Sequence, residues 1–364
     1  MIGLTHYRTA STEDLTLLED VTYPQRVHLL PDTVKNLKLG LNYVPHKLAE
    51  KVLDPDLLQS LRDNPMVKSA FILAAGNTHF AGINPLARQS QLTYQYKVLP
   101  LSLTQVYAGR IAQQCGAVDH IVTDSSACAS SLKVMMDVQT LIKFYGFDRV
   151  CVLAVEDAVT NLTTEFFGEA KANLLAQHDD AGILPSAFDD KNHSFHIGQG
   201  ACFAVFERYP DEAEAYLHGA YTASEACTNQ MGQRDDGLGF AKAIDGAISC
   251  STFYNYNISV VKTHGTGTAM NNKSERAALE DRLESFVATS YKPTIGHTMG
   301  ASGLLETCLL VDSLKTGIVP AIKNRTEEDR VYLSEPAKYD GGAILSLAAG
   351  MGNVYSAAIF TMGS

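Results

Sequence analysis

The segment HIVTDSSACASSLKVMMDVQTLIKFYG, residues 120–146, decides the fold class of this chain. Residues 120–124 form a short apolar run typical of a β-strand, and residues 129–146 place apolar side chains on most faces of a helix. A tight turn, SSAC, separates the two, and Gly146 suits the end of the helix. This order of strand, turn and buried helix predicts an α/β fold.

Cys128 lies where this helix is expected to begin, between two alanines. A free cysteine is most often a packing residue of the core. At a helix N-terminus, however, unpaired N–H groups and the helix dipole favour thiolate, the nucleophilic form. Ala127 and Ala129 leave room for a substrate beside the sulfur. Both interpretations remain open until the rest of the chain is considered.

The composition limits the possible classes of protein. The chain has 364 residues, 46% of them hydrophobic, which is enough for a large core in one or two domains. Its net charge of −11 argues against nucleic acid or an anionic membrane as a general partner. There is no signal-peptide pattern and no apolar run of about 18 residues that would span a membrane. Seven scattered cysteines predict neither disulfides nor a zinc site, so we expect a cytoplasmic protein.

Further apolar segments alternate with helical ones along the chain. Strands are expected over 69–76, 149–157, 200–208, 257–265, 343–352 and 356–362, and helices over 100–116, 272–283 and 301–317. The polar segment 170–197 is interpreted as a connection. Two α/β halves are therefore expected to meet near residue 200, and a repeat of one unit in both would indicate duplication.

Two histidines lie in glycine-rich turns at expected strand ends. His264 is in KTHGTGT, residues 262–268, and His297 is in YKPTIGHTMGASG, residues 291–303. A single loop histidine is most often a hydrogen-bonded structural residue. Together with Cys128, on three separate turns, the two histidines form the pattern in which a nucleophile and its partners converge from distant positions. This combination favours Cys128 as a nucleophile.

The same turns resemble the motifs of the β-ketoacyl-acyl-carrier-protein synthases. Cys128 lies in the counterpart of the nucleophile motif, His264 and His297 lie in counterparts of the two histidine motifs, and Glu156 ends a strand that matches a family strand. The segments occur in the family's order between about residue 69 and the C-terminus, and they are DSSACASSL, VCVLAVEDA, SAFDDKNHSFHIGQGACFAVFE, HGTGTAMNNKSE and SYKPTIGHTMGASGLLE. Five ordered motifs make the resemblance specific.

The resemblance implies a thiolase-like fold, a five-layered αβαβα core built from two similar halves. The N-terminal half, 1–200, would carry the nucleophile, and the C-terminal half, 201–364, would carry both histidines. The Cys-His-His set is that of the elongating synthases, types I and II. Family members are normally dimers, so a homodimer, or a heterodimer with a ketosynthase-like subunit, is expected.

The resemblance also implies a reaction, a decarboxylative Claisen condensation. Cys128 would take an acyl group from the phosphopantetheine of an acyl carrier protein, and a second carrier would deliver a malonyl group; no resident cofactor is implied. His264 and His297 would stabilise the enolate, and Lys292 would pair with Glu306 and fix His297. The product would be a β-ketoacyl carrier protein of fatty-acid, polyene or polyketide biosynthesis.

The glycine-flanked turn GMGN resembles the family's gating loop, with Met351 where the family has phenylalanine. Backbone N–H groups of Cys128 and of the Gly350–Gly352 turn would form the oxyanion hole. Other departures from the family pattern are Gln199, Ala269, Asn272 and Asn353. An acidic carrier needs a local basic patch on this acidic chain, and the candidates are Lys97, Arg88 and Arg110.

Two other functions are considered. A chain-length-factor-like partner subunit would lack catalysis, and such subunits usually lack the nucleophile, whereas Cys128, His264 and His297 are all present. A thiolase acting on coenzyme A would use a second cysteine near the C-terminus, and no cysteine follows Cys308. A condensing enzyme is therefore favoured.

Overall fold

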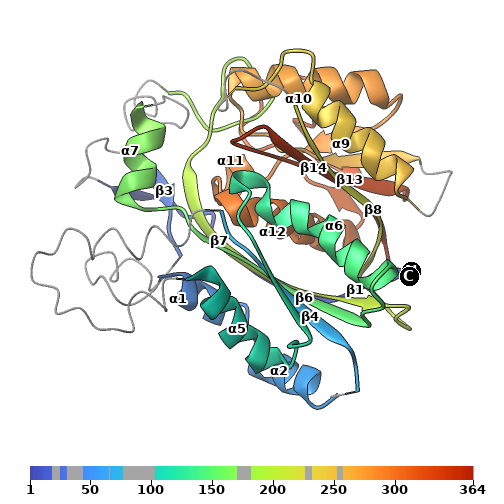
Figure 1. Ribbon diagram of the computed structural model, residues 1–364. Helices are drawn as coiled ribbons and strands as arrows, with labels where there is room; N and C mark the ends of the chain where they lie inside the picture. The colour runs from blue at the N-terminus through green and yellow to red at the C-terminus, as the bar shows by residue number, and fades with distance from the viewer. Residues whose placement is uncertain are drawn as a thin grey trace, which may run out of the picture.

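The computed structural model describes residues 1–18, 25–30, 44–64, 66–76, 103–169, 182–225, 232–251 and 257–363 (Figure 1). The described residues form five layers, in which helices and sheets alternate. This is the αβαβα architecture expected from the sequence. The layers matter for function because the central one carries both Cys128 and the turn of His297.

The main path of the sheet in the N-terminal half runs through five strands around a buried centre, and β3 (Gln25–His28) also pairs with β7. Strand β6 (Arg149–Asp157) lies in the middle, and all nine of its residues are buried, as is typical of a strand covered on both faces. It pairs in parallel with β4 and antiparallel with β7. The full order is β1 (Ile2–Ala10), β7 (Ile197–Arg208), β6, β4 (Ser69–Ala74) and β5 (His120–Asp124).

The sheet of the C-terminal half repeats this arrangement. Strand β13 takes the place of β6, since it pairs in parallel with β9 and antiparallel with β14. The order is β8 (Ala215–Ser224), β14 (Val354–Met362), β13 (Ala343–Gly350), β9 (Ile258–Lys262) and β10 (Val287–Thr289). The two sheets join where residues 2–4 of β1 pair with residues 215–217 of β8. The two similar halves expected from the sequence are therefore confirmed.

Two buried helices, one from each half, form the central layer (Figure 1). They are α6 (Ser130–Lys143) and α12 (Ser302–Lys315), and each contacts both sheets. Helices α1 (Val44–Glu50), α2 (Pro55–Arg62) and α5 (Thr104–Cys115) form the layer outside the first sheet, and α9 (Leu238–Ser249) and α10 (Ala269–Arg282) cover the second. The short elements are β2 (Thr16–Leu18), β3 (Gln25–His28), α7 (Asn161–Glu169), α11 (Lys292–Ile295), β11 (Ile318–Val319) and β12 (Ala337–Lys338).

Most of the expected elements are present, with ends that shift by a few residues. Residues 182–196 contain neither helix nor strand, in agreement with the expected connection, whose earlier part lies outside the described residues. Strands β1 and β8 and helix α9 were not predicted. The division at residue 200 remains a prediction, and β7 runs continuously across it from Ile197 to Arg208. Among the described helices, none is long and apolar enough to cross a membrane.

A buried polar pair at the end of β6 explains one departure from the family pattern. Gln199 Nε2 donates to Asp157 Oδ1 at 2.9 Å, and Gln199 Oε1 accepts from the Leu30 N–H at 3.1 Å. A glutamate at 199 would place a second carboxylate against Asp157. Burial raises the pKa of Asp157 to about 6, although the Gln199 amide and the Val159 N–H act in the opposite direction.

Replacing Asp157 by Asn should change how stability depends on pH. The folded-state pKa of Asp157 lies above the unfolded value of 3.8, so its contribution is complete below about pH 4 and is lost as the pH rises through about 6. Asp157→Asn has no such loss. Its free energy of unfolding relative to wild type should therefore increase by about 1 kcal/mol from pH 5 to pH 8. Urea unfolding at both values measures it, and a difference that stays constant would contradict the assignment.

Candidate active site

Cys128 lies in a short 3₁₀ turn that leads directly into α6. The turn is η2 (Ala127–Ala129), and the Cys128 side chain is almost fully buried. Ala127 has φ of +48°, an uncommon conformation for a residue other than glycine. Ser130 closes the turn, because its Oγ accepts from the Ser126 N–H at 2.8 Å and donates to the Ala127 carbonyl at 2.7 Å. The turn expected from the sequence is therefore present.

The C-terminal half contains an equivalent turn that packs against the first. It is η3 (Met299–Ala301), which leads into α12, and Met299 has φ of +45°, matching Ala127. The Met299 Sδ lies 3.7 Å from the Cys128 Sγ. Strained non-glycine residues of this kind cluster at functional sites. The two halves thus meet at the sulfur of Cys128.

His297 and His264 lie together beside this junction. Their ring centroids are 5.7 Å apart, with the planes at 79°. The Met299 N–H donates to His297 Nδ1 at 3.2 Å, so the ring proton of the neutral imidazole lies on Nε2. Ser302 Oγ also lies 3.1 Å from this Nδ1. His297 therefore offers an N–H donor from the far side of its ring.

Both histidines stay neutral over the ordinary pH range. Burial lowers the pKa of each imidazole well below its usual value, and the charge of Lys292 adds to the effect in both cases. A neutral imidazole donates one hydrogen bond through its ring N–H, and the lowered pKa makes each ring a weak base toward the proton of a thiol. The pair is therefore suited to stabilise an oxyanion or enolate by hydrogen bonding.

A buried carboxylate from α10 holds the turn that carries His264. Glu275 Oε1 accepts from the His264 N–H at 2.5 Å, and Oε2 accepts from the Gly265 N–H at 2.9 Å. Asn271 Nδ2 also donates to Glu275 Oε2, at 2.9 Å. These bonds fix the backbone on which His264 is placed. Glu275 was not singled out from the sequence.

Lys292 pairs with Glu306, as the resemblance implied. The Lys292 Nζ lies 2.9 Å from Glu306 Oε1 and 3.2 Å from Oε2, and neither side chain is exposed. A second lysine shares this carboxylate, with Lys262 Nζ at 3.3 Å from Oε2. Lys262 was missed by sequence analysis, although a lysine in the apolar strand NISVVK, two residues before His264, is an unusual feature.

The expectation that Cys128 favours thiolate in the resting protein is wrong. Burial raises the pKa of the Cys128 thiol to about 12, and the Glu156 charge acts in the same direction, while Lys292 opposes them. Glu156 lies at the end of β6 and accepts from the N–H groups of Gly76 at 2.6 Å and Gly300 at 3.3 Å. Cys128 is therefore a protonated thiol over the ordinary pH range.

The hairpin between β13 and β14 contacts η2, the turn that carries Cys128. A Cβ on Gly350 would lie 2.6 Å from the Ser126 carbonyl and 3.1 Å from the Ala129 N, so only glycine allows this approach. Gly352 and Asn353 have positive φ and close the hairpin, while Met351 is 40% exposed. The oxyanion-hole and gating roles of this turn remain predictions.

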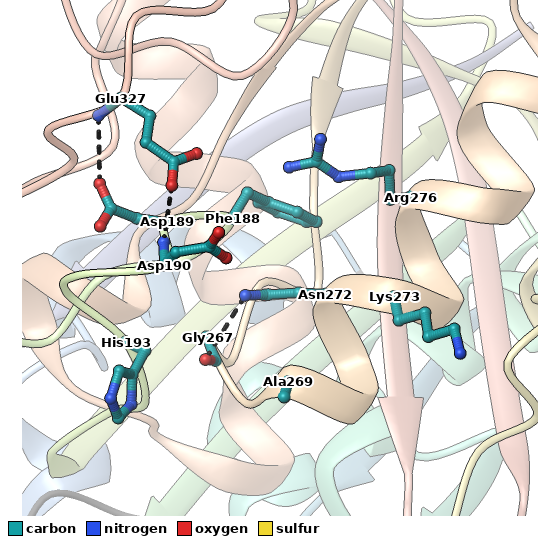
Figure 2. Close-up of a pocket in the computed structure, with 10 residues that line it drawn as sticks. All are labelled: Phe188, Asp189, Asp190, His193, Gly267, Ala269, Asn272, Lys273, Arg276 and Glu327. Atoms are coloured by element: carbon teal, nitrogen blue, oxygen red, sulfur yellow. Dashed lines mark hydrogen bonds between the residues drawn. The ribbon is translucent and has the colours of Figure 1, made fainter.

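A hollow of about 480 Å³ lies beside the His264 turn (Figure 2). Asn272, Lys273 and Arg276 of α10 line one side, and a loop with Asp189, Asp190 and His193 lines the other. Arg276 stacks over the Tyr332 ring at 4.6 Å. The described residues contain no cluster of three side chains that would hold a metal. Of the candidate carrier-binding cations, Lys97 and Arg88 lie outside the described residues, and Arg110 is exposed on α5.

Comparisons with known proteins give one family. A model described as the beta-ketoacyl synthase N-terminal domain matches residues 38–212, and the C-terminal-domain model matches 214–326. The tetracenomycin polyketide synthase ketoacyl synthase alpha subunit of Streptomyces glaucescens is 28% identical over 264 residues, 68% of this chain and 62% of that protein. The 3-oxoacyl-[acyl-carrier-protein] synthase 2 of Vibrio cholerae is 27% identical over 239 residues, 62% of this chain and 57% of that protein. The chain spans less than two thirds of the length of these curated relatives.

Solved structures share the fold over nearly the whole chain. A type II polyketide synthase acyl-carrier protein in complex with its ketosynthase gives a TM-score of 0.83 at 18% identity, covering 99% of this chain and 98% of the other. A ketosynthase in complex with its chain length factor from Xenorhabdus doucetiae gives 0.77 at 17% identity, with the same coverage. At this level of identity, the likeness supports the thiolase-like fold alone.

Replacing Glu306 should destabilise the protein more than replacing Lys292. Glu306→Gln leaves two buried lysines without a counter-charge and should lower the free energy of unfolding by about 3–5 kcal/mol. Lys292→Met leaves Lys262 paired with Glu306, so its loss should be smaller. Urea unfolding measures both, with Glu214→Gln as control, because that partly exposed pair with Lys315 should contribute less than about 1 kcal/mol. Equal losses for the two buried variants would contradict a shared carboxylate.

Proposed function

Because this chain belongs to the beta-ketoacyl synthase family, we propose that it catalyses the decarboxylative condensation of an acyl group with malonyl-acyl carrier protein. The observation that carries the proposal is the meeting of the two halves at Cys128, with His264 and His297 beside the junction. The pathway is fatty-acid, polyene or polyketide biosynthesis. The partners are an acyl carrier protein and a second ketosynthase-like subunit, identical or different, in the cytoplasm.

The first half-reaction transfers the acyl group to Cys128. The thiol sulfur forms a bond to the thioester carbonyl carbon, the carbon–sulfur bond to the carrier breaks, and the thiol proton leaves with the carrier thiol. Backbone N–H groups of Cys128 and of the Gly350–Gly352 turn stabilise the oxyanion of this step. The acyl chain of the substrate enters an apolar region, because Phe167, Phe195 and Met299 pack in one cluster with Cys128.

The second half-reaction forms the carbon–carbon bond. The malonyl group releases carbon dioxide, and the electron pair of the broken bond becomes an enolate. His264 and His297 donate hydrogen bonds to the thioester oxygen that carries this charge, and each such donor contributes about 10²–10³ in rate. The enolate carbon bonds to the acyl carbonyl, the bond to Cys128 breaks, and one proton restores the thiol.

The alternative is a non-catalytic subunit like a chain length factor, and one of the structures that share the fold contains such a subunit. In that role Cys128 would not be acylated, and the charged groups around the histidines would have no reacting substrate to stabilise. The Met299–His297 hydrogen bond and the paired turns are fully formed, which favours catalysis. The two functions are separated by acylation of Cys128.

Acyl transfer and decarboxylation should depend on different residues. With hexanoyl-pantetheine, the acyl adduct should form on Cys128 and disappear in Cys128→Ala. His264→Ala and His297→Ala should retain much of this acylation but lose carbon dioxide release from malonyl-pantetheine by about 100-fold or more, because their donors meet only the enolate. Peptide mass analysis and single-turnover gas release measure the two steps.

His218→Ala is the matched control, since this buried histidine of β8 lies outside the site and contacts Thr361. It should leave both steps unchanged at equal folded fraction. An adduct on Cys115 instead of Cys128 would overturn the nucleophile. Histidine variants that fail at acylation yet decarboxylate normally would overturn their roles.

Met351 should determine how wide a range of acyl chains can be transferred to Cys128. Methionine is slimmer and more flexible than phenylalanine, and glycines flank it on both sides, so we expect a wide or kinked chain to be admitted. Met351→Phe should narrow the accepted chains and leave acetyl transfer nearly unchanged. Acylation rates of both proteins against chain length and unsaturation test this. Identical profiles would place the gate elsewhere.

A further inference from the structure

Lys262 is a buried lysine for which the proposed mechanism has no use. It is the last residue of β9, two residues before His264, and its exposed fraction is 0%. Its backbone pairs with Ser346 of β13 and Thr289 of β10, so the side chain begins in the middle of a sheet. A lysine without access to water is rare unless its ammonium group is paired.

The ammonium of Lys262 is only partly paired. Its Nζ donates to the Leu347 carbonyl at 2.7 Å and to Glu306 Oε2 at 3.3 Å. Glu306 is nearer to Lys292, at 2.9 Å and 3.2 Å. One carboxylate thus serves two ammonium groups, and all three side chains have an exposed fraction of 0%. The cluster carries one positive charge more than its carboxylate neutralises.

The other ionisable groups around Lys262 have different partners. Glu275 of α10 accepts from the His264 and Gly265 N–H groups, and Glu156 of β6 accepts from Gly76 and Gly300. His264 and His297 are neutral, and Cys128 is a thiol. Burial, together with the Lys292 charge, lowers the pKa of Lys262 to about 8 against the pull of Glu306, so the lysine is charged at pH 7 and loses its charge above pH 8.

We propose that Lys262 is a positioning residue that, by sharing Glu306 with Lys292, leaves the Lys292 ammonium incompletely neutralised and so supplies net positive charge to the site of the enolate. This inference rests on the proposed function. The cluster lies beside the two histidines, because Lys262 is two residues before His264, and Ser302, four residues before Glu306 on α12, lies 3.1 Å from His297 Nδ1. In agreement with this placement, the Lys292 charge lowers the pKa of both imidazoles. In a site closed to water, a fixed positive charge stabilises a developing anion more strongly than it does in solution.

Two variants separate the charge of Lys262 from its hydrogen bonds. Lys262→Met removes both, while Lys262→Gln keeps an N–H donor without charge. Both should fold, because a neutral side chain of similar length replaces a charge that costs free energy to bury. Lys315→Met is the matched control, since Lys315 ends the same helix as Glu306 and pairs with partly exposed carboxylates.

The first readout is carbon dioxide release from malonyl-pantetheine between pH 6 and pH 9, beside acylation by hexanoyl-pantetheine. Wild type should lose decarboxylation above pH 8. Both Lys262 variants should release carbon dioxide about tenfold more slowly at pH 7, and this rate should depend less on pH than in wild type. A tenfold change in rate corresponds to a modest change in transition-state stabilisation. The rate of acylation should change by less than about threefold, which corresponds to a smaller change still. Lys315→Met should match wild type.

The second readout needs no substrate and holds even if the proposed function fails. When Lys262 is removed, Glu306 neutralises Lys292 more completely, so the pKa of Cys128 should rise and its alkylation by iodoacetamide at pH 7, where Lys262 of the wild type is charged, should slow. Peptide mass analysis follows Cys128 separately from the exposed Cys250. Decarboxylation within twofold of wild type at every pH, or an unchanged alkylation profile, would overturn the inference. A wild type that is neither acylated nor active would overturn the proposed function alone.

Discussion

The close approach of two equivalent turns, η2 and η3, is the constraint on which the site depends. Each joins a sheet to a central helix, and each begins with a strained residue, Ala127 or Met299. A Cβ on Gly300 would lie 2.2 Å from the Gly76 N, so any larger residue would push the turns apart. The same contact places the Met299 N–H against His297 and the Met299 sulfur against Cys128. The repeated arrangement of the two halves thus brings groups from both to a single point.

Burial then determines the charges at that point. It keeps Cys128 as a thiol and both histidines neutral, and it makes the three side chains of the lysine–glutamate cluster the fixed charges beside them. A site arranged in this way is poised for negative charge that appears only during reaction. Acyl transfer and decarboxylation both generate such charge, which is why the arrangement suits a condensing enzyme.

The candidate site residues that could be predicted from the sequence are those whose signals are local. Cys128, His264 and His297 each lie in a short turn with small or glycine neighbours, and the turns are visible without tertiary information. Lys262 and Glu275 were missed because their roles depend on partners 44 and 10 or 11 residues away across packed elements. The thiolate expectation failed for the same reason, since desolvation of Cys128 arises only when both halves close over it. Strand β8, AYLHGAYTAS, mixes polar and small residues and lacks a clear period, so its place beside β14 could not be predicted.

The central claim is that Cys128, His264 and His297 meet at one point. Its most direct test is a crystal structure of the protein alkylated with a pantetheine chloroacetamide, a reaction in which a cysteine sulfur displaces chloride. We expect the new bond on Cys128, with the amide carbonyl oxygen within hydrogen-bond distance of His297 Nε2 and of a ring nitrogen of His264, because we propose that both imidazoles donate to the enolate oxygen. An adduct on another cysteine, or a carbonyl that points away from both imidazoles, would contradict the account.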